Sequence, residues 1–266
     1  MESAPAYGDA CALVAIDVLR ATTTAVTGAA LGRLVYPVPT LEAAHRQAKD
    51  LANPLLAGEI EGLMPTGFEI NNSPSALVRR TDTERPLLLL STSGTRLIWS
   101  YGETRPVYVT CLRNYSAQAA HLIQERQQQV ALIGAGSRGE FRLEDMLCCA
   151  LLASALLKAG YEPLDAKTQT ILNAWESAPL SSITGGKSAQ YLRESGQEDD
   201  LAFVLTHIDD LPGVYQFSQG QIVEVAKMSS VRTDMASQKP AEGVPIDLHL
   251  LADTSDHPKL TGLVGF

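Results

Sequence analysis

Short apolar runs alternate with helix-like segments through the first 160 residues, and no other feature of the sequence constrains the fold as much. The runs are rich in Val, Ile and Leu and have the length of buried strands. We expect strands at Cys11–Ile16, Leu34–Val38, Pro54–Ala57, Pro86–Leu90, Val107–Thr110 and Val130–Ile133. We expect helices at Thr24–Leu31, Leu41–Leu51, Ser73–Arg80, Thr95–Ser100, Ser116–Arg126 and Leu143–Lys158. This alternation predicts an α/β layered fold.

The rest of the chain is mainly helical up to a terminal β-hairpin. Its expected helices and hairpin strands are Ala166–Ala174, Lys187–Glu194, Asp199–Thr206, Val214–Phe217 and Gln221–Val225. Residues 229–266 are rich in Ser, Pro, Asp and Gly with little periodicity, so we treat them as a tail of unknown order. We therefore expect one domain over residues 1–228, with two lobes, 1–160 and 161–228, as the alternative.

Charge and composition exclude several classes of partner. The 266-residue chain has a formal net charge of −9, whereas sequence-independent binding of nucleic acid needs a basic surface. No secretory signal precedes the first strand, and the longest apolar stretch, Leu147–Leu157, is too short to span a bilayer. The four cysteines fit no zinc pattern. We expect a cytoplasmic protein that binds neither nucleic acid nor membrane, and a homodimer is the default oligomer.

The turn after the first predicted strand combines a carboxylate, a guanidinium and hydroxyl groups. Asp17 and Arg20 follow the strand, and Thr22 and Thr23 lie where the next helix begins. The free N–H groups of a helix start bind anions, and an arginine can clamp a phosphate through two hydrogen bonds. The alternative is an ion pair between Asp17 and Arg20 with Thr22 as a helix cap, and spacing alone does not separate the two.

A second turn, after the strand at Pro86–Leu90, repeats this chemistry. Its members place hydroxyls, a glycine and an arginine at a helix start, and they are Thr92, Ser93, Gly94, Thr95 and Arg96. Backbone N–H groups of such a turn can hold a phosphate. The commoner alternative for one such turn is a capped turn with an exposed arginine. Two such turns favour an anion site, because ligands of open α/β sheets bind beyond the carboxyl ends of the strands.

Oxygen-bearing side chains that suit magnesium lie in two further segments. Glu59 is in the glycine-rich stretch after the third strand, and Asn72 and Ser73 end that stretch. Glu144 and Asp145 lie in the first turn of the long helix, where they either face the site or stabilise the helix dipole. For the glycine-rich stretch, a solvated loop is the alternative.

The segment Gly134–Gly139 matches the GxGxxG string of dinucleotide-binding turns. No second strand with a terminal acidic residue follows about 20 residues later, so a nicotinamide-dependent enzyme is the weaker alternative. There is no GxSxG motif, and Leu19 breaks the DxD string of aspartyl-phosphate phosphatases. We therefore favour a metal over a histidine base.

Four segments, IDVLRATTT, GFEINNSP, STSGTR and GAGSRGEFRLED, together resemble the 2-phosphosulfolactate phosphatase family, the ComB family of coenzyme M biosynthesis. The resemblance runs from about Ala12 to Ala150 and continues weakly to the hairpin. It implies a three-layer α/β/α fold with a mixed sheet. It also implies magnesium-dependent hydrolysis of a small anionic phosphate ester, either (2R)-2-phospho-3-sulfolactate, which gives 3-sulfolactate and phosphate, or a related 2-hydroxy-acid phosphate.

With this resemblance we assign roles to individual residues. The catalytic residues are Asp17, Arg20 and Arg96, and the Mg²⁺ ligands are Asp17, Glu59, Glu144 and Asp145. The substrate-binding residues are Thr22, Thr23, Asn72, Ser73, Thr92, Ser93, Gly94, Thr95 and Gly139. Three positions depart from the family pattern, because Ala57 stands in place of a glycine, Ile60 in place of an arginine and Ser93 in place of an asparagine. These departures motivate the alternative of a non-catalytic, anion-binding homologue with the same fold.

Overall fold

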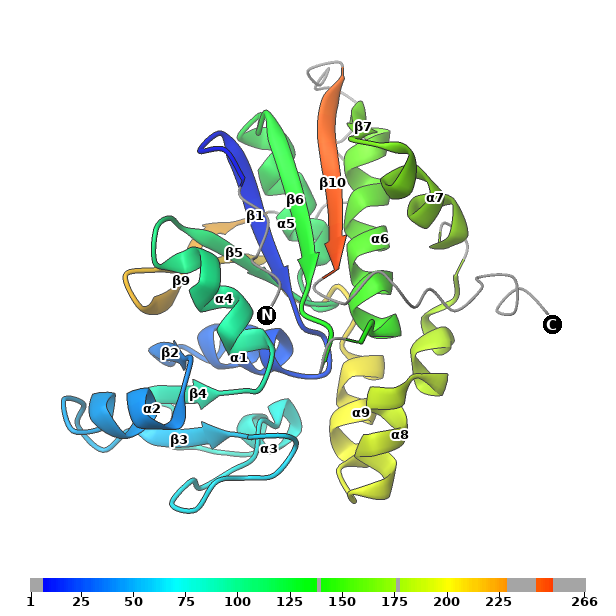
Figure 1. Ribbon diagram of the computed structural model, residues 1–266. Helices are drawn as coiled ribbons and strands as arrows, with labels where there is room; N and C mark the ends of the chain where they lie inside the picture. The colour runs from blue at the N-terminus through cyan, green and yellow to red at the C-terminus, as the bar shows by residue number, and fades with distance from the viewer. Residues whose placement is uncertain (1–6, 138–139, 176–177, 229–242, 251–266) are drawn as a thin grey trace.

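The computed structural model describes residues 7–137, 140–175, 178–228 and 243–250 (Figure 1). Its strands are β1 (Cys11–Ile16), β2 (Val35–Val38), β3 (Leu55–Gly58), β4 (Leu87–Leu90), β5 (Val107–Thr110), β6 (Gln129–Gly134), β7 (Tyr161–Pro163), β8 (Gly213–Ser218), β9 (Gln221–Lys227) and β10 (Val244–Leu250). Its helices are α1 (Ala21–Ala30), α2 (Leu41–Gln47), α3 (Pro74–Val78), α4 (Gly94–Gly102), α5 (Tyr115–Gln124), α6 (Leu143–Lys158), α7 (Ala166–Trp175), α8 (Lys187–Glu194), α9 (Glu198–Thr206) and the 3-10 helix η1 (Leu180–Gly185).

Helices cover both faces of one mixed sheet, whose strand order is β3-β4-β2-β9-β8-β5-β1-β6-β10-β7. Strand β1 is buried on both faces, which explains its uninterrupted apolar sequence. On one face Val14 packs in a cluster with Leu122 of α5 and Leu152 of α6. On the other face Leu13 packs in a second cluster with Ile98 of α4. This arrangement confirms the predicted three-layer α/β/α fold.

Two parallel units make up the sheet, and an antiparallel hairpin joins them. Strands β5, β1, β6, β10 and β7 are parallel to one another, as are β3, β4 and β2. The β8–β9 hairpin lies between the units and pairs antiparallel with β5 on one side and β2 on the other. The sequence predicts the hairpin near the end of the chain, and the structure places it in the centre of the sheet.

The carboxyl ends of both parallel units point to one region. Figure 1 shows β3 and β4 running across the direction of β1 and β6, with the arrowheads of both pairs directed toward the region between α1 and α8. The turns after β1, β3, β4 and β6 therefore meet, although the two units belong to opposite parts of the sheet. This meeting point is where an open α/β sheet binds its ligands.

Residues 244–250 form a strand in a segment that the sequence prediction leaves without structure. Strand β10 inserts between β6 and β7 and pairs parallel with both. Ile246 and Leu248 are buried in the core, and their alternation with Pro245 and Asp247 is a period-2 signal that could have revealed the strand. No helix in the described part of the chain is both long enough and apolar enough to cross a membrane.

Candidate functional site

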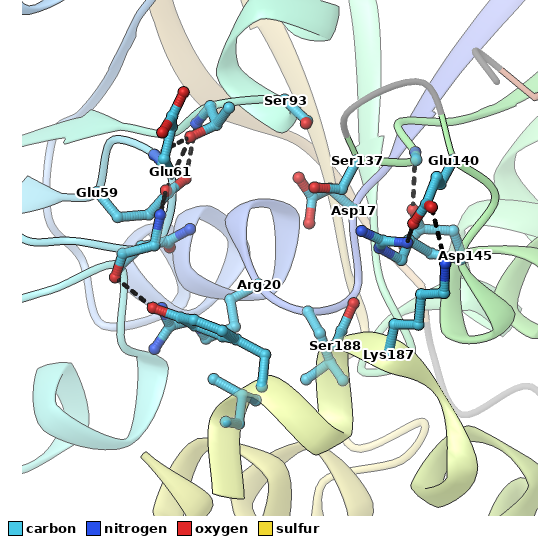
Figure 2. A pocket seen from close by; sticks show the side chains of 18 residues that line it. Asp17, Arg20, Glu59, Glu61, Ser93, Ser137, Glu140, Asp145, Lys187 and Ser188 are labelled. Atoms are coloured by element: carbon cyan, nitrogen blue, oxygen red, sulfur yellow. Dashed lines mark hydrogen bonds and ion pairs between the residues drawn. The ribbon is translucent and has the colours of Figure 1, made fainter. Parts of the chain in front are cut away.

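A cavity of about 400 Å³ opens where the turns after β1, β3, β4 and β6 meet α8 (Figure 2). Its acidic lining residues among those described are Asp17, Glu59, Glu61, Glu140 and Asp145. Its basic lining residues are Arg20, Arg142 and Lys187, and the uncharged polar ones include Asn72, Thr92, Ser93, Ser137, Ser188 and Tyr191. The cavity thus lies at the predicted edge of the sheet and concentrates charges of both signs.

Asp17 directly follows β1 and lies between the two sides of the cavity in Figure 2. Its N–H donates to Thr22 Oγ1 (2.9 Å), and the Thr22 hydroxyl donates to the Asp17 carbonyl (2.8 Å), which closes the turn. Its Oδ1 accepts from the Ala21 N–H (3.2 Å) at the start of α1. Asp17 is only 8% exposed, and this burial, with the charges of Glu59 and Glu144, raises its pKa to about 7.

Two further buried carboxylates open α6. Asp145 accepts from the Val18 N–H (2.8 Å) and from the Gly136 N–H (3.2 Å), so it joins the turn after β1 to the turn after β6. Burial and the charges of Asp17 and Glu144 raise the pKa of Asp145 well above its usual range. Burial also raises the pKa of Glu144, whose Oε2 is buried without a hydrogen-bond partner in the described part of the chain. Three carboxylates therefore share one poorly solvated site.

This donor set suits a divalent cation with few protein ligands. The described residues contain no group of three or more His, Cys, Asp or Glu side chains arranged to hold a metal ion. Mg²⁺, however, is commonly held by one or two carboxylates together with water and substrate phosphate oxygens. Asp17 and Asp145 line the cavity, so these two carboxylates fit that smaller requirement. Glu144 is not among the described residues that line the cavity, and its unpartnered Oε2 adds negative charge behind Asp145.

Glu59 fastens the turn after β3 to the turn after β4. Its Oε1 accepts from the Thr92 N–H (2.6 Å), and its Oε2 accepts from the Thr92 hydroxyl (2.8 Å) and the Gly62 N–H (2.5 Å). Both oxygens of this predicted metal ligand therefore have protein donors, as both oxygens of Asp145 do, and each carboxylate keeps further lone pairs for a cation. The contacts position Thr92 at the cavity wall, and metal binding by Glu59 stays a prediction.

Arg20 is buried and held by acceptors from two segments, the start of α9 and the residues before α3. Its Nη1 donates to Asp200 Oδ2 (2.6 Å) and Gln197 Oε1 (2.7 Å), and its Nη2 donates to Asn71 Oδ1 (3.3 Å). Asp200 also accepts from the Ser73 hydroxyl (2.7 Å), so α9 connects the cavity to the start of α3. The counter-charge of Arg20 is thus Asp200. The sequence does not single out Asp200, because an acidic residue in the first turn of a helix usually stabilises the helix dipole.

The other predicted residues occupy different surroundings. Those that line the cavity are Asn72, Thr92 and Ser93. Those that are buried and donate their hydroxyls to the backbone or to Asp200 are Thr22, Thr23, Ser73 and Thr95. Arg96 is exposed on α4 and is not among the described residues that line the cavity. Gly139 lies outside the described residues.

Gly94 begins α4 and lies against the carboxylate of Asp17. A Cβ atom at this position would lie 2.3 Å from Asp17 Oδ2 and 2.5 Å from the Cβ of Ala21. Both distances are too short for non-bonded atoms, so only glycine allows this approach without a shift. The approach places the positive end of the α4 dipole beside Asp17.

Helix α8 supplies cavity residues that the sequence does not predict as site residues. Lys187, Ser188 and Tyr191 all line the cavity. The Tyr191 hydroxyl donates to the carbonyl of Gly62 (2.8 Å), which fastens α8 to the turn after β3. The polar residues of α8 are typical of a solvated helix face, and this contact, with the packing of Leu192 against Leu19, brings them to the site.

Comparisons with known proteins agree on one family. The sequence model of the family described as 2-phosphosulpholactate phosphatase matches residues 2–219. A probable 2-phosphosulfolactate phosphatase of Synechococcus sp. (strain RCC307) is 33% identical over 235 residues, covering 80% of this chain and 95% of that protein. A protein of the same name from Clostridium perfringens (strain SM101 / Type A) is 30% identical over 220 residues, with coverages of 80% and 88%. A third, from Symbiobacterium thermophilum, is 31% identical, with coverages of 79% and 92%.

Proposed function

The chain belongs to the 2-phosphosulfolactate phosphatase family, a family of phosphoric monoester hydrolases, and from this membership we propose a magnesium-dependent phosphatase. Its substrate is 2-phosphosulfolactate or a related 2-hydroxy-acid phosphate, which it hydrolyses to the hydroxy acid and phosphate. The observation that carries the proposal is the site formed by three buried carboxylates beside a buried arginine: Asp17, Glu144, Asp145 and Arg20.

Asp17 and Asp145 would hold the metal ion, with Glu144 as the third source of negative charge. Mg²⁺ bound there supplies positive charge that polarises the phosphoryl group and orients the attacking water. The raised pKa values of all three carboxyls reflect a site that favours neutral groups. A bound cation favours their ionised forms, so metal binding and loss of protons are coupled here.

Arg20 would bind the oxygens of the phosphoryl group that is transferred. Phosphoryl transfer depends mainly on positioning and on stabilising negative charge, which a fixed guanidinium provides. The contacts with Asp200 and Gln197 hold Arg20 in place before the substrate arrives, so little reorganisation is needed. The hydroxyls of Thr92 and Ser93 and the start of α4 lie at the same cavity and supply neutral donors.

Asp17 fits two roles in this reaction, as a metal ligand and as a nucleophile. As a nucleophile, its carboxylate oxygen would attack phosphorus, the ester oxygen would leave with a proton, and water would then hydrolyse the aspartyl phosphate. Rapid quenching with labelled substrate separates the roles, because only the second traps phosphate on the protein. We favour the role of metal ligand. Asp145 and Glu144 are also buried carboxylates close to Asp17, and a bound cation would compensate the negative charge of all three.

A phosphate-release assay tests the function. Purified protein is given 2-phosphosulfolactate, phospholactate, phosphoglycolate and an aryl phosphate, each with Mg²⁺ or with EDTA. We expect release from at least one hydroxy-acid phosphate with Mg²⁺ and none with EDTA. Thermal stabilisation by these ligands without any phosphate release would instead establish the non-catalytic, anion-binding homologue.

The nicotinamide alternative receives less support from the same contacts. The Gly136 N–H of the GxGxxG-like turn donates to Asp145, so this turn serves the carboxylate cluster. A shift of the melting temperature by NAD or NADP would revive that alternative. A cytoplasmic homodimer that acts in coenzyme M biosynthesis stays part of the proposal, and light scattering of the purified protein tests the dimer.

A further inference from the structure

The basic residues of the cavity differ in how firmly they are paired. Arg20 has Asp200 as its counter-charge, and the side chain of Asp200 is only 2% exposed. Arg142 and Lys187 instead share Glu140, whose Oε2 lies 3.0 Å from Arg142 Nη1 and whose Oε1 lies 2.7 Å from Lys187 Nζ. The Glu140 side chain is 49% exposed. One half-exposed carboxylate thus serves two cations.

This side of the cavity has unused hydrogen-bond donors. Arg142 Nε is buried and has no hydrogen-bond partner among the residues that the structure describes. Lys187 is the first residue of α8, an eight-residue helix whose N-cap, Gly186, has no side chain to cap it. The free N–H groups and positive dipole end of α8 therefore add to the charge of Lys187. An anion that enters here finds the exposed Lys187 ammonium group and the N–H groups at the start of α8.

Glu140 can give way to a ligand at low cost. The pair of Glu140 with Lys187 is exposed on both sides, 49% and 70%, and it contributes little to stability, because water screens its charges and can replace either partner. Breaking the contact between Arg20 and Asp200 would instead leave a buried charge unpaired, which is strongly unfavourable. An incoming acid group therefore displaces Glu140 from Lys187 more readily than it displaces Asp200 from Arg20.

The two groups of cations lie on opposite sides of Asp17. In Figure 2, Arg20 is on the side of Glu59, whereas Lys187 and Glu140 are on the side of Asp145. A small molecule with two acid groups can therefore span the cavity with one near Arg20, the other near Lys187, and its centre over Asp17. A volume of about 400 Å³ is within the range of small-molecule sites.

We propose that Arg142, Lys187 and the start of α8 form a second anion subsite. It binds the acid group that the substrate keeps after hydrolysis, a sulfonate or a carboxylate, and Glu140 occupies it when no ligand is bound. The inference rests on the proposed function, because it assigns the transferred phosphoryl group to the side of Asp17 and Arg20. The subsite then selects substrates that carry a second acid group.

Three substitutions test the subsite: Lys187→Met, Arg142→Met and Glu140→Gln. The first two should raise KM for 2-phosphosulfolactate at least about tenfold, since each removes a charged hydrogen-bond donor. KM for an aryl phosphate without a second acid group should rise much less. Glu140→Gln should lower KM for 2-phosphosulfolactate, because the competing carboxylate is gone. The control is Arg193→Met, which removes a charge from the exposed end of α8, where Arg193 donates to the carbonyl of Thr184.

Comparison of substrates identifies the acid group. If the subsite binds sulfonate, Lys187→Met should raise KM for 2-phosphosulfolactate and leave phospholactate almost unaffected. If it binds carboxylate, both values should rise together. If Lys187→Met raised KM equally for all substrates, the aryl phosphate included, the subsite would be overturned. An unchanged KM for every substrate would also overturn it. The Lys187 side chain is 70% exposed, so this substitution does not threaten the fold.

A binding measurement separates failure of the subsite from failure of the proposed function. Calorimetry with 3-sulfolactate and Mg²⁺ compares the wild type with Lys187→Met. A wild type that releases no phosphate but binds 3-sulfolactate through Lys187 contradicts the function and supports the subsite. An active wild type whose Lys187→Met variant binds 3-sulfolactate equally well supports the function and overturns the subsite. A wild type that neither hydrolyses the esters nor binds 3-sulfolactate overturns both.

Discussion

The turn after β1 and the turn after β4 are similar in sequence and different in what they bring to the cavity. Each has hydroxyl residues and an arginine at the start of a helix, and the sequence predicts the same anion-binding role for both. The first turn directs Asp17 and Arg20 into the cavity, whereas the second directs Ser93 there and leaves Arg96 exposed. The difference lies in tertiary partners, because Asp200 holds the first arginine from α9.

The turn after β1 therefore supplies the charged groups of the cavity, and the turn after β4 supplies uncharged residues that pack against them. The two turns meet where Gly94 lies against Asp17, and an added Cβ there would lie 2.3 Å from the carboxylate oxygen. If this division is right, substitutions in the first turn should have much larger effects on turnover than substitutions in the second.

Asp17→Asn should have the largest effect. The amide keeps the size of the side chain but cannot supply the negative charge for a metal ion, so we expect kcat to fall about a thousandfold. Steady-state phosphate release, with circular dichroism as a check on folding, measures this. The matched control is Asp199→Asn, whose side chain is 71% exposed in a surface pair with Arg79 and should behave as wild type. Similar losses in both variants would contradict a special role for Asp17.

Arg20→Lys should reduce kcat about a hundredfold, because an ammonium group cannot replace the planar fork that faces both the cavity and its acceptors. Arg33→Lys is the control. Arg33 is also buried and pairs with Asp82 (2.9 Å), but it is not among the described residues that line the cavity. We expect Arg33→Lys to lower the melting temperature while the active fraction keeps its turnover. Equal losses of turnover would mean that Arg20 acts only through stability.

Gly94→Ala should reduce kcat about tenfold, since the new methyl group must push Asp17 or α4 aside and small displacements of catalytic groups are costly. Gly8→Ala is the control, because an added Cβ there meets no atom within 4 Å. A variant Gly94→Ala with normal turnover would show that the second turn does not shape the first.

The same contrast explains what the sequence could and could not predict. Alternating apolar runs suffice for the α/β/α layers, and polar residues at strand ends suffice for the position of the cavity. Local pattern does not specify which side chains turn inward. Arg20 does so because of Asp200, which lies 180 positions further along the chain, and Lys187 does so because Tyr191 docks α8 on Gly62. Contacts of this kind depend on packing between distant elements.

The central place of the β8–β9 hairpin in the sheet could not be predicted from the sequence for a related reason. Its strands pair with β5 and β2, which come much earlier in the chain, and β9 meets β2 through a single pair of residues, Val35 and Ile222. A hairpin signal reports the local turn and says nothing about which strands lie beside it. Strand β10 is a different case, because buried and less buried residues alternate along its own short sequence.

The pH dependence of the melting temperature of the metal-free protein should also differ between substitutions in the two turns. The pKa of Asp17 is raised to about 7 from 3.8, so its contribution to stability is complete below pH 3.8 and is lost as the pH rises through about 7. In EDTA, Asp17→Asn should therefore melt about 5 °C higher than wild type at pH 8, and the gap should narrow toward pH 5. Ser93→Ala in the second turn should show no such dependence on pH. A constant gap for Asp17→Asn would contradict the raised pKa.

Arg96→Ala should have the smallest effect, less than about a threefold change in kcat/KM, because an exposed charge is screened by water and salt. The assay is the same phosphate release, repeated at low and high ionic strength, where a purely long-range contribution should fade as salt is added. A loss as large as that of Arg20→Lys, independent of salt, would show that Arg96 turns into the cavity when the substrate binds. The two turns would then form one anion site after all, and the exposed position of Arg96 would describe only the ligand-free state.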